Sequence, residues 1–243
     1  MSFAIVFIFG LVFGGIATAI TYRFIIDDKY FQKYFECPIC YHKLQASHLI
    51  PVFSYFVVLQ RHCLFCTNKI SIVYPLVEIV CGILFVLTYL FFRDNIYQFA
   101  FIAFVVYALL ITSIIDMETY SVPNIILLIL FLLGILYCAF INKSGLLAIA
   151  SGVSMFFVIL AAGKIVSVIL KKDSIGFGDV ILLPVLTLFL EVKMIPYFIT
   201  AAGLIGIIFG AMWKRLTDSE QFPFIPPISI AFISFCFYSQ INS

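Results

Sequence analysis

Long runs of apolar residues, separated by short polar breaks, make up most of this 243-residue chain. A helix of about 20 such residues matches the thickness of the hydrocarbon core of a bilayer. Hydrophobic residues account for 64% of the chain and charged residues for 11%, which is far from the composition of soluble globular domains. No alternation typical of outer-membrane strands recurs along the sequence. We therefore expect an all-α, polytopic membrane protein in contact with a lipid bilayer.

The apolar runs predict about eight transmembrane helices. They lie at about 3–22, 72–92, 96–115, 125–141, 145–163, 180–192, 194–213 and 224–240. The sixth is interrupted by Pro184, and the eighth carries Pro226 and Pro227 in its first turns, which makes these two the weakest helices. The prediction divides the chain into a first transmembrane helix at 1–22, a loop at 23–71 and a transmembrane domain at 72–243.

Basic residues set the expected orientation. With the N-terminus outside, eleven of the fourteen Lys and Arg residues fall on the inner side, against Arg93, Lys143 and Lys193 outside. Because Lys and Arg collect on the cytoplasmic side, the loop at 23–71 is expected in the cytoplasm. Arg23 follows the first apolar run instead of preceding it, so this run is expected to stay as an uncleaved span. The formal net charge of +2, with no basic stripe, predicts no nucleic-acid partner.

Four cysteines in the cytoplasmic loop form a candidate metal site. Cys37, Cys40, Cys63 and Cys66 have the pattern C-x2-C-x22-C-x2-C, in which two thiolate pairs can bind one tetrahedral Zn²⁺. His42, His48 and His62 lie in the same loop as alternative ligands. Disulfides or unliganded thiols are the other interpretation, and a reducing cytoplasm disfavours disulfides. The spacing favours a small zinc-binding loop domain. Cys81, Cys138 and Cys236 lie in predicted spans and are read as small apolar residues.

Four acids lie at or inside the predicted spans, where a charge costs about 3 kcal/mol or more. Asp116 and Glu118 follow the third span, Glu78 lies in the second, and Asp179 ends the sequence Gly176-Phe-Gly-Asp179. The predicted topology places Asp116 and Asp179 on the same side of the membrane. If helix packing brings them together, they form an acid–base dyad that shares one proton. Glycine before Asp179 lets another backbone approach closely. Each acid alone also fits a helix end, an interhelical hydrogen bond or a solvated position.

Together these motifs resemble the bacterial type IV prepilin peptidases, which belong with the GxGD intramembrane aspartyl proteases. The resemblance runs from about Gly14 to Phe232 and includes the paired cysteines, Tyr74-Pro75-Leu76-Val77-Glu78, Asp116 with Pro123, and Gly176-Phe-Gly-Asp179. Two departures are Thr18, where the family usually has Asn, and Asn124 after Pro123, where it has Asp.

The resemblance implies that Asp116 and Asp179 are catalytic, with Gly176, Gly178 and Glu78 in support. It implies substrates that are type IV prepilins or pseudopilins, cut after a glycine at the cytoplasmic face of the bacterial inner membrane. Many members also methylate the new N-terminus with S-adenosylmethionine, and the sequence leaves that activity open. Two alternatives stay open as well: a zinc-stabilised membrane scaffold of a secretion apparatus, and a transporter, although no second copy of the Gly176–Asp179 region supports the latter. The sequence does not fix the oligomeric state.

Overall fold

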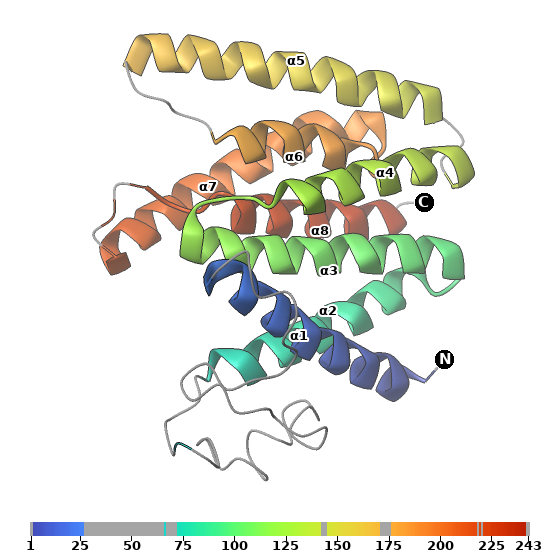
Figure 1. Cartoon of the computed structure of the whole chain (residues 1–243). Helices are drawn as coiled ribbons and strands as arrows, with labels where there is room; N and C mark the ends of the chain where they lie inside the picture. The colour runs from blue at the N-terminus through green and yellow to red at the C-terminus, as the bar shows by residue number, and fades with distance from the viewer. Residues whose placement is uncertain are drawn as a thin grey trace. The chain divides into compact units, whose positions relative to one another are not determined.

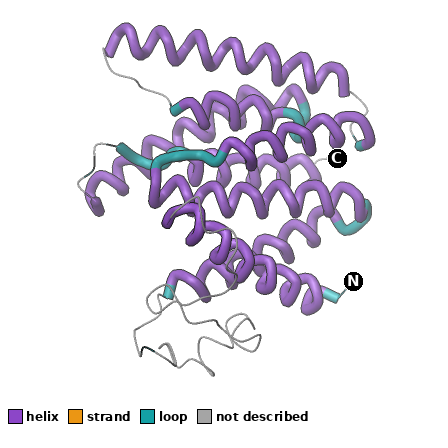
Figure 2. Tube along the Cα trace, in the orientation of Figure 1, coloured by secondary structure: helices purple, strands orange, loops and turns teal. Residues whose placement is uncertain are grey.

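The computed structural model describes residues 2–26, 66, 72–141, 145–170, 176–217, 219 and 221–241. The described residues form eight α-helices and one short 3₁₀ helix, and no strand occurs among them (Figure 2). The helices are α1 (Phe3–Ile26), α2 (Val73–Phe92), α3 (Ile96–Thr119), α4 (Asn124–Phe140), α5 (Gly145–Leu170), α6 (Phe177–Thr187), η3 (Val192–Met194), α7 (Ile195–Thr217) and α8 (Ile225–Ile241), labelled in Figure 1. All eight predicted helices are present.

Among the residues that the structure describes, five helical segments are long and apolar enough to cross a membrane: Phe3–Tyr22, Val73–Phe92, Ile96–Thr119, Gly145–Ile165 and Val192–Thr217. The prediction of an all-helical, polytopic membrane protein is thus confirmed. Helices α4, α6 and α8 are shorter, and the 11 residues of α6 rise only about 16 Å, roughly half the thickness of the hydrocarbon core. Eight complete crossings stay a prediction.

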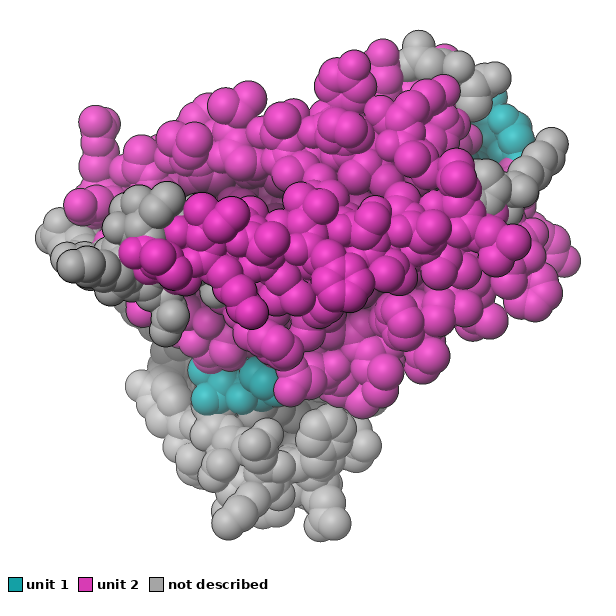
Figure 3. All heavy atoms as spheres, turned by 90° about the horizontal axis from the view of Figure 1, so that it is seen from above, with its two compact units in different colours: residues 1–94 teal, residues 95–243 magenta. Residues whose placement is uncertain are grey.

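Contacts divide the chain into two compact units, residues 1–94 and 95–243, which Figure 3 colours separately. Unit 1 contains α1 and α2, whose backbones meet at glycines. A Cβ atom added at Gly10 would lie 2.6 Å from Cα of Gly82, and one added at Gly14 would lie 2.6 Å from Cα of Glu78. Such close approach through small residues is typical of helix pairs in membranes. The three-part division at residues 22 and 71 stays a prediction.

Unit 2 is built around α3, which is more than half buried and packs against α4 and α8. Helix α8 also packs against α7, and α6 packs against α4 and α5. Helix α5 lies at the edge of this unit and is mostly exposed, in Figure 1 above α6. Its exposed apolar side chains, such as Phe157 and Val168, fit a surface that faces lipid.

Two helix ends differ from the prediction and both concern the candidate site. Helix α3 continues to Thr119 instead of ending at residue 115, so Asp116 lies in its last turn, and the chain then turns through Tyr120 in the left-handed conformation (φ 52°). Pro184 does not interrupt α6, which continues to Thr187. Beyond it, the N–H groups of Leu188, Phe189 and Leu190 bond to carbonyls three residues back, so the chain leaves the helix in tightened turns.

Candidate active site

Asp116 is a buried acid whose carboxylate is held by the start of another helix. Its side chain lies in the last turn of α3 with 6% of its surface exposed. Its Oδ2 atom accepts a hydrogen bond of 3.0 Å from the N–H of Ile225, the first residue of α8. The first N–H groups of a helix lack partners within the helix and carry partial positive charge, so they stabilise an anion. The bond compensates for burying the carboxylate.

Asp179 lies in the first turn of α6 and is half-buried. The helix begins after Gly176, which is extended (φ −66°, ψ 140°) and whose carbonyl accepts the N–H of Asp179 at 3.1 Å. A Cβ added at Gly176 would lie 3.1 Å from Oδ2 of Asp179. The carboxylate therefore folds back over the backbone of Gly176, where a larger residue would crowd it.

The two acids interact although 63 residues separate them in the sequence. Asp179 lies outside the five segments long enough to span a membrane. Burial and, to a smaller extent, the negative charge of Asp116 together raise the pKa of Asp179 to about 7, against a lowering by the backbone of Gly176. Electrostatic influence of this kind requires that the carboxyl groups are near neighbours. The carboxyl groups at the end of α3 and the start of α6 thus lie within electrostatic reach of each other, and Asp179 retains its proton more readily than an exposed Asp. Their role as a catalytic pair stays a prediction.

Gly178 makes this juxtaposition sterically possible. A Cβ added there would lie 2.5 Å from Cγ2 of Val122, in the short segment that follows α3. No real Cβ tolerates that separation, so only glycine lets the first turn of α6 lie against this segment. The contact joins the stretch after Asp116 to the stretch that carries Asp179.

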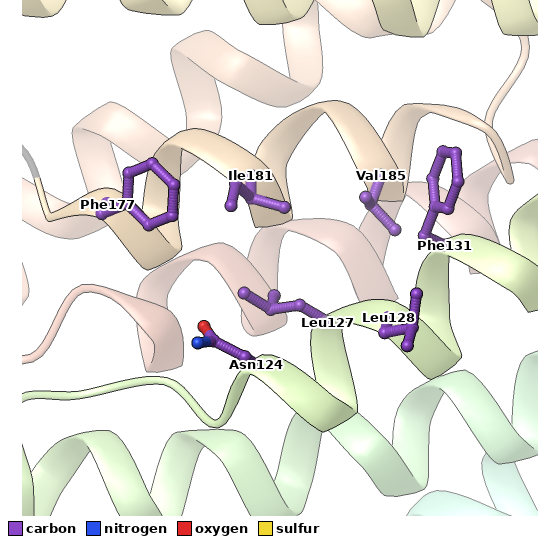
Figure 4. Close-up of a pocket in the computed structure, with 7 residues that line it drawn as sticks. All are labelled: Asn124, Leu127, Leu128, Phe131, Phe177, Ile181 and Val185. Atoms are coloured by element: carbon purple, nitrogen blue, oxygen red, sulfur yellow. The ribbon is translucent and has the colours of Figure 1, made fainter.

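A cavity of about 280 Å³ opens beside the first turn of α6. It lies between α4 and α6 and is lined by Asn124, Leu127, Leu128, Phe131, Phe177, Ile181 and Val185 (Figure 4). Phe177 is the residue between Gly176 and Gly178, so the cavity adjoins the turn that carries Asp179. Asn124 is the polar residue of this lining.

The other two candidate acids, Glu118 and Glu78, are less buried than Asp116 and lie in other surroundings. Glu118 is exposed on the last turn of α3. Glu78 belongs to α2 in unit 1 and is half-buried. Its side chain reaches α1, since a Cβ added at Gly15 would lie 3.3 Å from its Oε1. Its supporting role stays a prediction.

The candidate zinc ligands fall largely outside the described residues. Cys37, Cys40 and Cys63 are not described, and Cys66 is half-buried. Within the described part of the chain, no three His, Cys, Asp or Glu residues form a group that could hold a metal ion. Cys81, Cys138 and Cys236 are buried in helices, as expected of small apolar residues. The zinc site stays a prediction that rests on the thiolate spacing.

Sequence reasoning missed the backbone donor at Ile225, because a main-chain N–H has no side-chain signature. It also missed Tyr120, whose hydroxyl accepts a hydrogen bond of 3.2 Å from the indole N–H of Trp213. Tyr120 ends α3 in the left-handed conformation that commonly terminates helices, and its N–H bonds to the carbonyl of Asp116. Pro226-Pro227 was the signal available for α8, since a helix that starts with two prolines offers few other N–H donors.

Comparison with known proteins gives independent evidence on the family to which this chain is similar. Residues 8–92 match the bacterial peptidase A24 N-terminal domain, and residues 103–211 match the type IV leader peptidase family. A prepilin leader peptidase/N-methyltransferase of Bacillus subtilis (strain 168) is 29% identical over 93% of this chain and 90% of its own length. A protein of the same name from Neisseria gonorrhoeae is 28% identical over 80% of this chain and 68% of its own length. Another, from Burkholderia pseudomallei strain 1026b, is 31% identical over 78% of this chain and 62% of its own length. No solved structure matches.

Proposed function

The chain belongs to the type IV leader peptidase family, and we propose that it is a membrane aspartyl endopeptidase with Asp116 and Asp179 as its catalytic pair. The observation that carries the proposal is the close packing of Gly178 against Val122, which brings the start of α6 near the end of α3 and leaves Asp179 under the electrostatic influence of Asp116. A pair of adjacent carboxyl groups with one proton between them is the arrangement that an aspartyl protease requires.

In this mechanism the ionised carboxylate accepts a proton from water, and the protonated one donates a hydrogen bond to the scissile carbonyl oxygen. Attack of the water forms a tetrahedral intermediate, which collapses when the leaving amine receives a proton. Asp179 suits the acid role, since burial and the charge of Asp116 raise its pKa to about 7. Asp116, which accepts the Ile225 N–H, suits the base role.

We propose that the substrates are prepilins or pseudopilins, as the names of the relatives suggest. The cut would separate a basic leader from an apolar segment at the cytoplasmic face of the inner membrane. Support for this face comes from Lys214 and Arg215 in the last turn of α7, because their neighbour Trp213 donates a hydrogen bond to Tyr120, four residues after Asp116.

The direct test is to incubate the purified protein in detergent with a prepilin peptide that contains the leader, the glycine and the start of the apolar segment. We expect one cut after the glycine, detected by mass spectrometry. A membrane scaffold would bind the peptide and leave it intact. A transporter would also leave it intact and would show ion-coupled flux after reconstitution into vesicles. Either result would exclude the peptidase proposal.

We propose N-methylation of the new N-terminus as a second activity, because the similar proteins carry that name. No described residue is assigned to S-adenosylmethionine, and the sequence has no Gly-rich loop after a strand.

With labelled S-adenosylmethionine, we expect label on the mature pilin only after cleavage, because the amine does not exist before it. Asp116→Asn should block labelling of a precursor and leave labelling of a pre-cleaved pilin unchanged. Absence of label on both substrates in the wild-type protein would show a peptidase without methyltransferase activity.

We propose that Cys37, Cys40, Cys63 and Cys66 hold one structural zinc ion per chain, which would stabilise a loop too short to build a core. We expect about one Zn²⁺ per chain by elemental analysis. Cys37→Ser or Cys63→Ser should release it and expose the loop to proteolysis, because a thiolate lost from a tetrahedral site leaves a ligand missing. Cys138→Ser, in α4, is the control. Active protein without metal would contradict the proposal, and single Cys variants that keep full metal would point to His42 or His62 as a ligand.

A further inference from the structure

The connection between α7 and α8 rests on a glycine face of α7. Gly206 and Gly210, one turn apart on that helix, lie under Phe224 and Phe222 respectively. A Cβ added at Gly206 would overlap the ring of Phe224 at Cε2, and one added at Gly210 would lie 3.3 Å from the ring of Phe222. The two rings also pack edge to face, with centroids 5.9 Å apart. Phe224 is therefore seated on α7 with no room for a larger residue beneath it.

The residue seated on Gly206 is directly followed by the one that binds Asp116. The N–H of Ile225 donates to Asp116 Oδ2 at 3.0 Å, and the backbone N–H of Phe224 also interacts with that carboxylate. Pro226 and Pro227 carry no N–H, and the N–H of Ile228 bonds to the carbonyl of Phe224 at 3.2 Å. Of the first four residues of α8, Ile225 thus has the N–H that is directed to the carboxylate.

A second contact fixes how α8 lies along α3. The hydroxyls of Ser113 and Ser229 are 3.0 Å apart, and Ser229 also donates to the carbonyl of Ile225 at 2.8 Å. Ser113 precedes Asp116 by about one turn of α3, and Ser229 follows Ile225 by one turn of α8. This bond fixes the register of the two helices, while the ring of Phe224 fixes where the chain enters α8.

We propose that Gly206 and Phe224 are positioning residues for Asp116: the ring seated on Gly206 holds the Ile225 N–H against the carboxylate and so fixes the orientation of that carboxylate toward the attacking water. This inference rests on the proposed peptidase function. A tethered Oδ2 restricts rotation of the carboxylate, which matters because small displacements of a catalytic group cost large factors in rate. The donor lies outside residues 103–211, which match the peptidase family.

The first arm of the test removes the donor itself. Ile225 is the first residue of α8, a position where proline is tolerated, so Ile225→Pro deletes the N–H and keeps the helix start. Ile225→Ala is the control, because it removes more buried side chain than Ile225→Pro does and keeps the N–H. We expect kcat for prepilin cleavage to fall on the order of 10- to 100-fold more in Ile225→Pro than in Ile225→Ala, with KM unchanged, as for loss of a hydrogen bond to a charged group.

The second arm displaces the ring. Gly206→Ala should lower kcat by roughly tenfold, because the new methyl group overlaps Phe224. Gly203→Ala, on the same helix, is the matched control, since no atom lies within 4 Å of its added Cβ. Phe224→Leu, which removes the overlapping ring atoms, should restore part of the activity of Gly206→Ala although it lowers that of the wild type.

Thermal unfolding in detergent accompanies each assay and separates positioning from folding. Rescue of Gly206→Ala by Phe224→Leu, with unfolding temperatures close to that of the wild type, supports the positioning role. Equal kcat values in Ile225→Pro and Ile225→Ala overturn it and leave the peptidase function intact. A loss of kcat in Gly206→Ala that only accompanies a lower unfolding temperature, with no rescue by Phe224→Leu, overturns it as well. A wild-type protein that cuts no prepilin overturns the proposed function, and the positioning role with it.

Discussion

Replacing Asp116 or Asp179 by Asn is expected to abolish prepilin cleavage while the protein still inserts and folds. Asn keeps the size and the hydrogen-bonding capacity of Asp, but it cannot exchange a proton. Each single substitution should lower kcat by about 10⁴-fold or more, and the double variant should be little worse, because residues that act as one unit are non-additive. Cleavage of a prepilin peptide by purified, detergent-solubilised variants measures the effect.

Two other acids serve as controls for that result. Glu118→Gln changes an exposed acid in the same last turn of α3, and Glu78→Gln changes a half-buried acid of unit 1. Both substitutions should lower kcat far less than the Asp substitutions do, as expected if Glu118 is solvated and Glu78 is structural. Substantial activity in a correctly inserted Asp179→Asn protein would refute the aspartyl mechanism and leave the scaffold as the better reading.

The pH dependence of cleavage provides a further check on the same pair. The pKa of Asp179 is raised to about 7 by burial and by the charge of Asp116. Asp179 therefore keeps its proton at acidic pH and loses it as the pH rises through about 7. In the proposed mechanism this proton polarises the scissile carbonyl, so kcat should decline over that range, which gives one side of a bell-shaped profile. The two apparent constants belong to the pair and not to either residue.

Valine at Gly14 or Gly10 is expected to disrupt the packing of α1 against α2. At both positions the added Cβ would meet backbone atoms of α2 at 2.6 Å, and backbone cannot rotate away as a flexible side chain does. The helices must separate and lose the contacts between them, including the stacked rings of Phe13 and Phe85. Overpacking of this kind costs about 1–3 kcal/mol for each site. Thermal unfolding in detergent should show the loss as a lower midpoint.

Gly15→Ala is the matched control for this prediction. Its added Cβ would lie 3.3 Å from Oε1 of Glu78, the far end of a side chain that can shift slightly. We expect an unfolding midpoint near that of the wild type. A Gly14→Val protein as stable as Gly15→Ala would show that the backbones of α1 and α2 do not meet as closely as described.

The sequence by itself determined where the helices form. Each apolar run is long enough to satisfy its own backbone hydrogen bonds in a helix, and local residues set several ends. Asn95, for example, accepts the N–H groups of Tyr97 and Gln98 at 3.1 and 3.2 Å and so begins α3. The choice of Asp116 and Asp179 as candidates also needed only the sequence. The cost of a charge beside an apolar run singled out four acids, and the predicted topology and the family resemblance selected these two.

Helix ends and pairings depended on the tertiary structure. That α3 runs on past Asp116, and that Pro184 lies within α6, follows from packing that local propensity does not encode. The approach of Asp116 to Asp179 spans 63 residues and depends on glycine at 178 against Val122. The clearest case is the Ile225 N–H, a group that every residue but proline carries. Only the position of α8 against α3 makes it a partner for Asp116, since hydrogen bonds act over about 3 Å and sequence distance does not determine separation in space.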